Sequence, residues 1–283
     1  MSNEHGRIFK ANSDGIYFTR QLDNTNYNSM QHVEWSTASG IEGVMLANQI
    51  VNMNAVSRGE VKKVRTLISF DDGDTWNTIP ASMENQCISN EDCRLHFHSI
   101  NDYHKHGLVS SNPSAIGLGM GIGSAGTHLL PLSRSHTYLS RDAGKSWIKV
   151  SGRPTLYEIS DQGSIVVFAG LDTPTQHVSF SYDWGSTWHM ALFSETPVLV
   201  RSIAYVPTVH NLKILVSGIM IDQDQRTIVS TMSFSEMREC FHNQLNPRES
   251  DLEKWSPLNG EKDRCILGRE ALCMLYGVVD ITY

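Results

Sequence analysis

The stretch Ser69-Phe70-Asp71-Asp72-Gly73-Asp74-Thr75-Trp76 is one of three copies of a single eight-residue phrase in this chain of 283 residues. The other copies are Ser140-Arg141-Asp142-Ala143-Gly144-Lys145-Ser146-Trp147 and Ser181-Tyr182-Asp183-Trp184-Gly185-Ser186-Thr187-Trp188. Each fits the pattern Ser-x-Asp-x-Gly-x-[Ser/Thr]-Trp. A phrase that recurs along a chain indicates a repeat architecture, in which each copy belongs to one supersecondary unit.

Each phrase has the chemistry of a tight turn between two strands. The Ser and Asp side chains can hydrogen-bond to nearby backbone groups, and Gly adopts a positive φ without steric cost. Strand-like segments precede the phrases at residues 63–69, 137–140 and 177–181. We therefore expect three hairpin turns, with each Trp starting the next strand and packing between blades. The residues expected to have this structural role are Ser69, Asp71, Gly73, Trp76, Ser140, Asp142, Gly144, Trp147, Ser181, Asp183, Gly185 and Trp188.

The spacing of the phrases predicts β-propeller blades. The second phrase starts 71 residues after the first (69 to 140), and the third starts 41 residues after the second (140 to 181). One four-stranded blade repeats every 40 to 50 residues or so, roughly as in other propellers. The longer interval therefore holds one blade plus an insertion with Cys87 and Cys93. The phrase resembles the Asp-box of sialidases, sortilins and other propellers, and it predicts an all-β fold but no particular function.

The composition excludes some classes of partner. Hydrophobic residues make up 40% of the chain, and the formal net charge is −7 without a basic block, which argues against nucleic acid. The first residues have no apolar core, and no run of about 18 apolar residues occurs. We expect no signal peptide, no transmembrane helix and no membrane insertion by this chain itself.

The chain changes character near residue 235. Before it, strand-like segments prevail and no helical periodicity is convincing, as in a hairpin at 7–20 and in strands at 43–55, 164–169 and 213–218. After it, the sequence is more polar and contains Cys240, Cys265 and Cys273. The predicted organisation is a partial Asp-box β-propeller at residues 1–235 and a second, cysteine-containing region at 236–283.

Several further stretches, taken in order, resemble the luminal domain of the sortilin-type vacuolar protein sorting receptors, and most of all the fungal receptors that sort carboxypeptidase Y. The resemblance covers roughly residues 5–268. The stretches are Gly40-Ile41-Glu42-Gly43-Val44 with Ala47-Asn48, Asp92-Cys93-Arg94-Leu95-His96-Phe97-His98-Ser99 after Cys87, Ser110-Ser111-Asn112-Pro113-Ser114-Ala115-Ile116-Gly117, Thr137-Tyr138-Leu139-Ser140-Arg141-Asp142-Ala143-Gly144, Asp161-Gln162-Gly163-Ser164-Ile165, Asp251-Leu252-Glu253-Lys254-Trp255 and Cys265-Ile266-Leu267-Gly268.

The resemblance implies a ten-bladed propeller followed by a cysteine-rich module, in a receptor that captures cargo in the Golgi and releases it in an endosome. Residues 236–283 then correspond to the truncated start of that module, and the chain to a truncated paralogue. The expected location is the lumen of the Golgi, endosome and vacuole system, and the expected cargo is a vacuolar hydrolase or its propeptide. Cys87 and Cys93 are expected to form a loop-closing disulfide, while the pairing of Cys240, Cys265 and Cys273 stays open.

Three patterns invite a chemical interpretation that we consider weaker than a structural one. Asp71, Asp142 and Asp183 could be catalytic carboxylates or calcium ligands, but they recur at blade spacing as turn residues. The histidines at 96, 98, 104 and 106 could bind a metal, although the first two belong to the framework stretch quoted above. Gly121-Ile122-Gly123-Ser124-Ala125-Gly126 fits a dinucleotide pattern but lacks the following helix start. We therefore expect no catalytic, cofactor-binding or metal-binding residue, and no ligand-binding residue can be named.

Two other functions remain as alternatives to a sorting receptor. A sialidase-like glycoside hydrolase uses the same Asp-box propeller, but it needs paired carboxylates or a Tyr nucleophile, and an arginine cluster for its substrate. A remnant without a stable fold is the second alternative, because propeller blades without their neighbours leave open sheet edges.

Overall fold

The computed structural model describes residues 5–28, 31–37, 41–81, 93–99, 109–112, 114–160, 163–206, 213–221 and 225–234, and the backbone of four short strands near the C-terminus. The chain forms two compact units. Unit 1 comprises Met1–Pro113 and Gly117–Thr155, and unit 2 comprises Ser114–Ile116 and Leu156–Tyr283. The boundary at residue 235, predicted between the propeller and the cysteine-containing region, differs from this division into units and stays a prediction.

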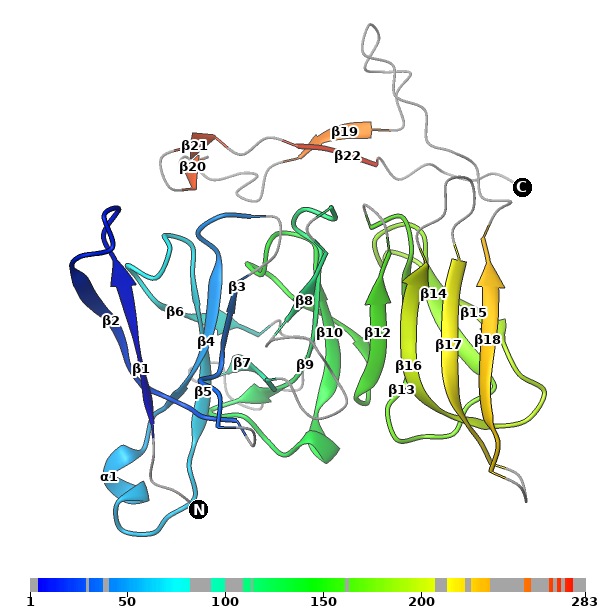
Figure 1. Ribbon diagram of the computed structural model, residues 1–283, viewed down its shortest axis with the longest axis horizontal. Coiled ribbons are helices and arrows are strands. Elements are labelled where there is room, and N and C mark those ends of the chain that lie inside the picture. Colours follow the sequence, from blue (N-terminus) through cyan, green and yellow to red (C-terminus); the bar gives the residue numbers. More distant parts are fainter. Residues whose placement is uncertain are drawn as a thin grey trace, which may run out of the picture. The chain divides into compact units, whose positions relative to one another are not determined.

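The fold is almost entirely antiparallel β-structure, as the repeated phrases predicted (Figure 1). Unit 1 contains a sheet with the order β1-β2-β4-β5-β6-β7-β9-β10-β11, with β3 paired to β4 and β8 paired to β9. Its elements are β1 (Gly6–Ala11), β2 (Phe18–Thr25), β3 (Trp35–Thr37), β4 (Met45–Ile50), α1 (Met53–Val56), β5 (Val64–Ser69), β6 (Asn77–Pro80), β7 (Arg94–Phe97), β8 (Ser110–Ser111), β9 (Gly119–Gly126), the 3-10 helix η2 (Leu132–Arg134), β10 (His136–Ser140) and β11 (Ile148–Ser151).

Unit 2 contains two larger sheets, ordered β12-β13-β14-β15 and β16-β17-β18. Two short strand pairs, β19 with β22 and β20 with β21, follow in the sequence. The elements are β12 (Thr155–Ile159), β13 (Val166–Gly170), β14 (His177–Ser181), β15 (His189–Leu192), β16 (Val198–Val206), β17 (Lys213–Met220), β18 (Thr227–Ser233), β19 (Leu252–Trp255), β20 (Cys265–Ile266), β21 (Arg269–Glu270) and β22 (Cys273–Tyr276).

The three repeated phrases join neighbouring strands as predicted. They connect β5 to β6, β10 to β11, and β14 to β15, and in each case the first strand ends on the Ser of the phrase. Each of the two intervals between phrases leads from one hairpin to the next, which is the blade repeat of a β-propeller.

One predicted strand ends earlier than expected. The segment 43–55 forms β4 only as far as Ile50, and the one-turn helix α1 follows. Asn52 ties the start of α1 to the segment before β5, because its side chain donates to the Val61 carbonyl (2.8 Å) and accepts from the Lys63 amide (2.7 Å). A helix of four residues is too short to leave a periodic signal in the sequence.

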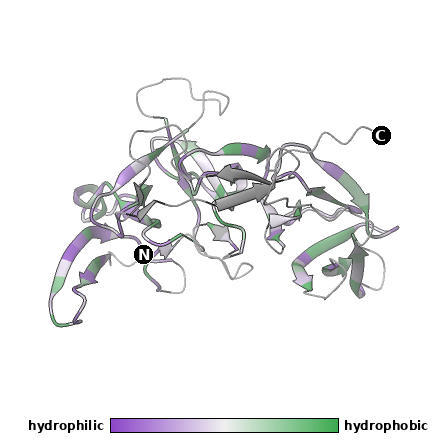
Figure 2. Ribbon diagram, turned by 90° about the horizontal axis from the view of Figure 1, so that it is seen from above, coloured by the Kyte–Doolittle hydropathy of each residue, from purple (hydrophilic) through white to green (hydrophobic). Residues whose placement is uncertain are grey.

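The core of unit 1 is built around three aromatic rings. Phe97 on β7 lies 4.5 Å from Trp147 and 6.2 Å from Tyr138 on β10, measured between ring centroids, and all three side chains are buried. Figure 2 shows hydrophobic residues in green along the strands, interrupted by hydrophilic ones. Burial of one such side chain contributes roughly 1.5 to 3 kcal/mol.

The core of unit 2 is aliphatic. Val166 and Val167 on β13, Val178 on β14, and Ile214 and Val216 on β17 are fully buried. Over the described residues, no helix has the length and hydrophobicity needed to cross a membrane.

Candidate functional site

The three Asp-box turns share one hydrogen-bond pattern. In the first, the Ser69 hydroxyl donates to the Asp71 carboxylate (2.8 Å) and accepts from the Gly73 amide (2.8 Å). The same carboxylate accepts from the amide (2.8 Å) and the hydroxyl (2.6 Å) of Thr75. The second and third turns repeat all four bonds, at 2.5 to 2.9 Å, through Ser140, Asp142, Gly144 and Ser146, and through Ser181, Asp183, Gly185 and Thr187.

In the first and third turns these bonds favour the charged form of the carboxylate. Burial by itself would raise the pKa of Asp71, but hydrogen bonds from Thr75 and Ser69 outweigh it and keep that pKa below its usual value. For Asp183, too, burial by itself would raise the pKa, but the hydrogen bonds from Thr187 and Ser181 outweigh it and keep the pKa below its usual value. Both carboxylate oxygens accept bonds within the turn, so the group is an acceptor for the backbone and not a proton donor.

The residue between Asp and Gly is a part of the turn that the sequence interpretation missed. Asp72, Ala143 and Trp184 have φ values of 59°, 61° and 59°, so two consecutive residues in each turn are left-handed, and not Gly alone. The amides of Asp72 and Ala143 donate to the carbonyls of Gly43 and Gly117, both at 2.9 Å. These two glycines lie in stretches that the family resemblance singled out, and their carbonyls anchor the first two turns.

The three Trp residues of the phrase differ in burial. Trp147 is buried, and its indole N–H donates to the Gly144 carbonyl (2.9 Å). Trp76 and Trp188 are only half-buried, and the Trp188 ring lies 4.7 Å from that of Phe168. The Trp147 ring lies 4.5 Å from that of Phe97, and the packing role expected of all three Trp residues stays a prediction.

Removing an Asp-box carboxylate is expected to destabilise the fold around it. Asp142→Ala deletes three hydrogen bonds and leaves the Ser146 amide without its acceptor, so we expect unit 1 to lose about 2 to 3 kcal/mol of unfolding free energy. Urea unfolding followed by tryptophan fluorescence measures this loss. Asp142→Asn keeps one acceptor oxygen and should lose less; equal stability of the alanine variant and the wild type would contradict the expected role.

His96 has both ring nitrogens engaged in the interior of unit 1. Its Nδ1 accepts from the Thr66 amide (3.2 Å), so Nε2 carries the proton and donates to the Gly126 carbonyl (3.0 Å). Burial lowers the pKa of His96 to about 4. The imidazole is therefore neutral and fixed in one tautomer.

His98 is a second histidine with a depressed pKa. Its Nε2 lies 2.9 Å from the Ser135 hydroxyl, and burial lowers its pKa to about 4 even though a hydrogen bond to Leu130 favours the charged form. Among the described residues, no group of three or more His, Cys, Asp or Glu side chains is arranged to hold a metal ion. The other two histidines of the sequence cluster, His104 and His106, lie outside the described residues.

A buried polar network surrounds His96, and the sequence interpretation missed it. The Thr66 hydroxyl donates to Asn48 Oδ1 (2.6 Å) and accepts from the Phe97 amide (2.7 Å). The Asn48 amide group donates to the Phe97 carbonyl (3.0 Å) and to Glu34 Oε2 (2.9 Å). Asn48, a fully buried polar residue of β4, was the sequence signal for this network, which ties β4, β5 and β7 together.

In unit 2, Glu158 on β12 is an ionisable side chain with a raised pKa. Burial raises the pKa of Glu158 to about 7, although the backbone N–H of Tyr205 on β16 donates to its carboxylate and acts in the opposite direction. The carboxyl group thus changes charge near neutral pH, within the sheet region where β13 lies against β16.

Replacing Glu158 by Gln is expected to stabilise unit 2 above neutral pH. Since the folded pKa of about 7 exceeds the ordinary 4.5, the group stabilises the fold fully below pH 4.5, and this stability is lost as the pH rises to 7. Because the Glu158 side chain is partly exposed, we expect Glu158→Gln to raise the free energy of unfolding by only about 1 to 2 kcal/mol at pH 8, and to leave it unchanged near pH 4.5. Urea unfolding at both pH values tests this, with Glu60→Gln, an exposed carboxylate, as the control.

Of the five cysteines, the structure describes Cys93 in full and Cys265 and Cys273 by their backbone. Cys93, just before β7, is disulfide-bonded. Cys87 and Cys240 lie outside the described residues, so the pairing of Cys87 with Cys93 stays a prediction. Cys265 and Cys273 lie in β20 and β22, of which only the backbone is described.

Antiparallel sheets, in which three hairpins turn on the same Asp-box pattern, define the class of this protein as an Asp-box β-propeller. The family model described as "Sortilin, neurotensin receptor 3" matches residues 1–203, and the chain belongs to the sortilin–Vps10 family.

The curated relatives include two fungal proteins named vacuolar protein sorting/targeting protein 10. The one from Laccaria bicolor is 32% identical over 274 residues, which cover 94% of this chain and 19% of the relative. The one from Schizosaccharomyces pombe is 32% identical over 275 residues, which cover 95% of this chain and 19% of the relative. The chain thus spans about a fifth of the length of these relatives. Among solved structures, Trypanosoma rangeli sialidase matches with a TM-score of 0.26 and 16% identity, over 84% of this chain and 42% of the sialidase.

Proposed function

We propose that this chain is a ligand-binding part of the luminal propeller of a sorting receptor, which carries vacuolar hydrolases or their propeptides from the Golgi to the endosome and vacuole. The observation that carries the proposal is the family membership of a chain whose Asp-box blades follow one another in order, together with relatives named for vacuolar protein sorting. The location in the lumen of that membrane system is part of the same proposal.

Binding without catalysis is supported by how the candidate side chains are used. The Asp-box carboxylates accept hydrogen bonds inside their own turns, and His96 uses both ring nitrogens inside the core. A cavity in unit 1, lined by Leu46, Leu118, Trp147 and neighbouring residues, has no charged side chain in its lining. Glycoside hydrolysis needs carboxylates that are free to exchange protons or attack the substrate.

The structural roles inferred from the sequence belong to the same proposal. The twelve Asp-box residues brace hairpin turns of the blades, and Cys87 closes a loop by pairing with Cys93, which is disulfide-bonded. Residues 236–283 form the start of a cysteine-rich module that follows the propeller.

A binding experiment with the 283-residue chain tests the proposed function. The oxidised chain is immobilised, and a vacuolar hydrolase precursor and the same hydrolase without its propeptide are passed over it. We expect saturable binding of the precursor and weaker or no binding of the mature enzyme. A chain that is folded by circular dichroism but binds neither form overturns the proposal, and turnover of a fluorogenic sialoside by the same sample replaces it with the enzyme alternative.

A further inference from the structure

Two Asp-Gly pairs occur in the described part of the chain, and both lie in hairpin turns. Asp14-Gly15 is in the turn between β1 and β2, and Asp72-Gly73 is in the first Asp-box. An Asp-Gly peptide can rearrange by itself, because glycine has no side chain to keep its peptide nitrogen away from the carboxyl group of the aspartate. The rearrangement needs a peptide nitrogen that can move and space for a new ring, so the two turns can be compared directly.

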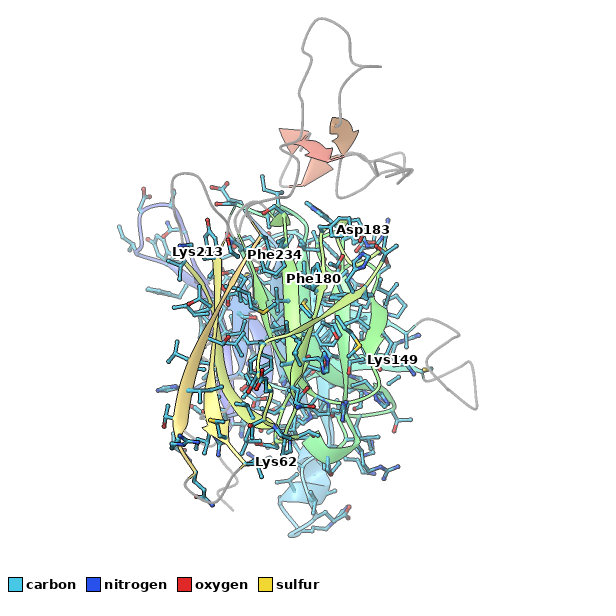
Figure 3. The ribbon with its side chains drawn as sticks, turned by 90° about the vertical axis from the view of Figure 1, so that its right-hand side faces the viewer. Lys62, Lys149, Phe180, Asp183, Lys213 and Phe234 are labelled. Atoms are coloured by element: carbon cyan, nitrogen blue, oxygen red, sulfur yellow. The ribbon has the colours of Figure 1, made fainter. Side chains whose placement is uncertain are left out.

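The turn at Asp14-Gly15 is exposed and loosely held. Residues 11–20 are all exposed, and a Cβ on Gly15 would meet no atom within 4 Å. The Gly15 amide donates to the Asn12 carbonyl (2.9 Å), and Asp14 makes no hydrogen bond or ion pair in the part of the chain that the structure describes. Figure 1 and Figure 3 both show this turn, in blue, at the closed end of the β1–β2 hairpin. Exposed loop tips of this kind open easily.

The turn at Asp72-Gly73 has the same dipeptide but is held on several sides. Gly73 is buried, and its amide donates to the Ser69 hydroxyl (2.8 Å). A Cβ on Gly73 would lie 3.6 Å from the Trp76 ring, so little space is left for a new ring. The Asp72 carboxylate is paired with the Lys10 ammonium group (3.3 Å). The first Asp-box therefore protects its own Asp-Gly peptide.

Asn12 is a second residue of the exposed turn whose side chain could attack its neighbour, and the turn itself prevents this. Its Oδ1 accepts from the amides of Ile16 (3.0 Å) and Tyr17 (3.1 Å). The Asn12 carboxamide is thus held across the turn and is not free to react with the next peptide nitrogen. This leaves Asp14 as the reactive side chain of the turn.

We propose that Asp14 is a site of spontaneous isoaspartate formation through a succinimide with Gly15. The Gly15 peptide nitrogen forms a bond to the side-chain carboxyl carbon of Asp14, and the carboxyl OH leaves as water with the amide proton. Water then adds at the main-chain carbonyl of the ring and opens it, so that the chain continues through the side-chain carboxyl carbon. One water is released and one is consumed, and nothing is oxidised or reduced.

The product differs from aspartate in the backbone itself. The chain between Asp14 and Gly15 becomes longer by one carbon, and the former main-chain carbonyl carbon becomes a free carboxylate. The Gly15 amide can then no longer reach the Asn12 carbonyl as it does in the present turn. The modification should therefore alter the end of the β1–β2 hairpin and leave the Asp-box turns unchanged.

Incubation of the folded 283-residue chain in mildly acidic buffer tests the proposal. Isoaspartate is located by peptide mapping with electron-transfer fragmentation and quantified with a protein isoaspartyl methyltransferase. We expect isoaspartate to form at Asp14 at least about tenfold faster than at Asp72, because a buried, hydrogen-bonded peptide reacts only from a locally opened state. Mapping also keeps this signal apart from that of Asn259-Gly260, which lies outside the described residues.

Two controls separate the effect of the fold from that of the local sequence. In urea above the unfolding midpoint, both Asp-Gly pairs should react at similar rates, because neither turn is then held. In the folded chain, Asp14→Glu should abolish the signal at this position, since closure of a six-membered ring is much slower, and should leave Asp72 unchanged. Circular dichroism confirms that the incubated chain stays folded. No isoaspartate at Asp14 in the folded chain, or equal rates at Asp14 and Asp72 there, overturns the proposal.

Discussion

Gly123→Ala is expected to destabilise unit 1 by about 3 to 5 kcal/mol, which is a large part of the stability of an ordinary domain. Gly123 lies on β9 between Phe97 on β7 and His136 on β10. A Cβ at this position would overlap the carbonyl oxygen of His96 and would lie 2.9 Å from its carbonyl carbon and 3.0 Å from the Phe97 ring. Backbone in the middle of a sheet cannot move aside without breaking its own hydrogen bonds.

A matched glycine provides the control for this substitution. Gly152 has open space where its Cβ would be, so Gly152→Ala should leave the midpoint of urea unfolding unchanged. Gly218→Ala in unit 2, where the new Cβ would lie 2.6 Å from Val198 and 3.0 Å from the Leu199 carbonyl carbon, should be as harmful as Gly123→Ala. If Gly123→Ala and Gly152→Ala unfold at the same urea concentration, the close approach of β9 and β7 is wrong.

Acidification is expected to destabilise unit 1 through His96 and His98. Burial holds both pKa values at about 4, against the ordinary 6.5 of an unfolded chain. Between these values the unfolded chain takes up protons that the folded chain does not, so stability is fully present above pH 6.5 and falls as the pH falls towards 4. Each histidine should lower the free energy of unfolding by about 2 kcal/mol near pH 5. For His96 the physical cause is that a proton on Nδ1 would face the Thr66 amide proton.

Urea unfolding of the wild type at about pH 7.5 and about pH 5 measures the loss. His96→Gln/His98→Gln removes the titrating groups, so its stability should be lower at neutral pH but nearly independent of pH over this interval. His32→Gln, at an exposed position, should retain the full pH dependence of the wild type. The expectation fails if the wild type is as stable at pH 5 as at pH 7.5, or if the double variant keeps the wild-type slope.

Unit 2 should respond to acid in the opposite direction. Glu158, with its pKa raised to about 7, gains a proton in the folded state first and therefore favours folding as the pH falls to 4.5. Unit 1 contains histidines that gain a positive charge on protonation, whereas unit 2 contains Glu158, which loses a negative charge. The same drop in pH is therefore expected to lower the stability of unit 1 and to raise that of unit 2.

The positions of the Asp-box turns could be read from the sequence because their causes are local. The strands end at Ser69, Ser140 and Ser181 as predicted, and the side-chain hydrogen bonds that close each turn join residues no more than four apart in sequence. The same local signal predicted the hairpin of β1 and β2, whose turn is held by the Asn12 side chain. Family membership likewise rested on short ordered stretches.

Other features could not be read from the sequence, because their causes lie far along the chain. His96 was a candidate metal ligand until its partners, Thr66 and Gly126, were seen to be 30 residues away in either direction. The glycine-rich segment fits a dinucleotide pattern, but a strand with close backbone approach was the preferred interpretation, and the segment forms β9; that β7 is the strand that approaches, at Gly123, could not be predicted. In both cases the residue type suggested an unusual role, but the actual role depends on a contact with a residue that is distant in the sequence.

The sequence by itself determined the all-β class, the three turns and the family, because each depends on groups that are neighbours along the chain. Only the tertiary structure decided which histidines are neutral, which carboxyl group titrates near pH 7, and which glycine lets two strands approach closely. These properties depend on burial and on strand pairing, and both arise only when segments that are distant in sequence pack together.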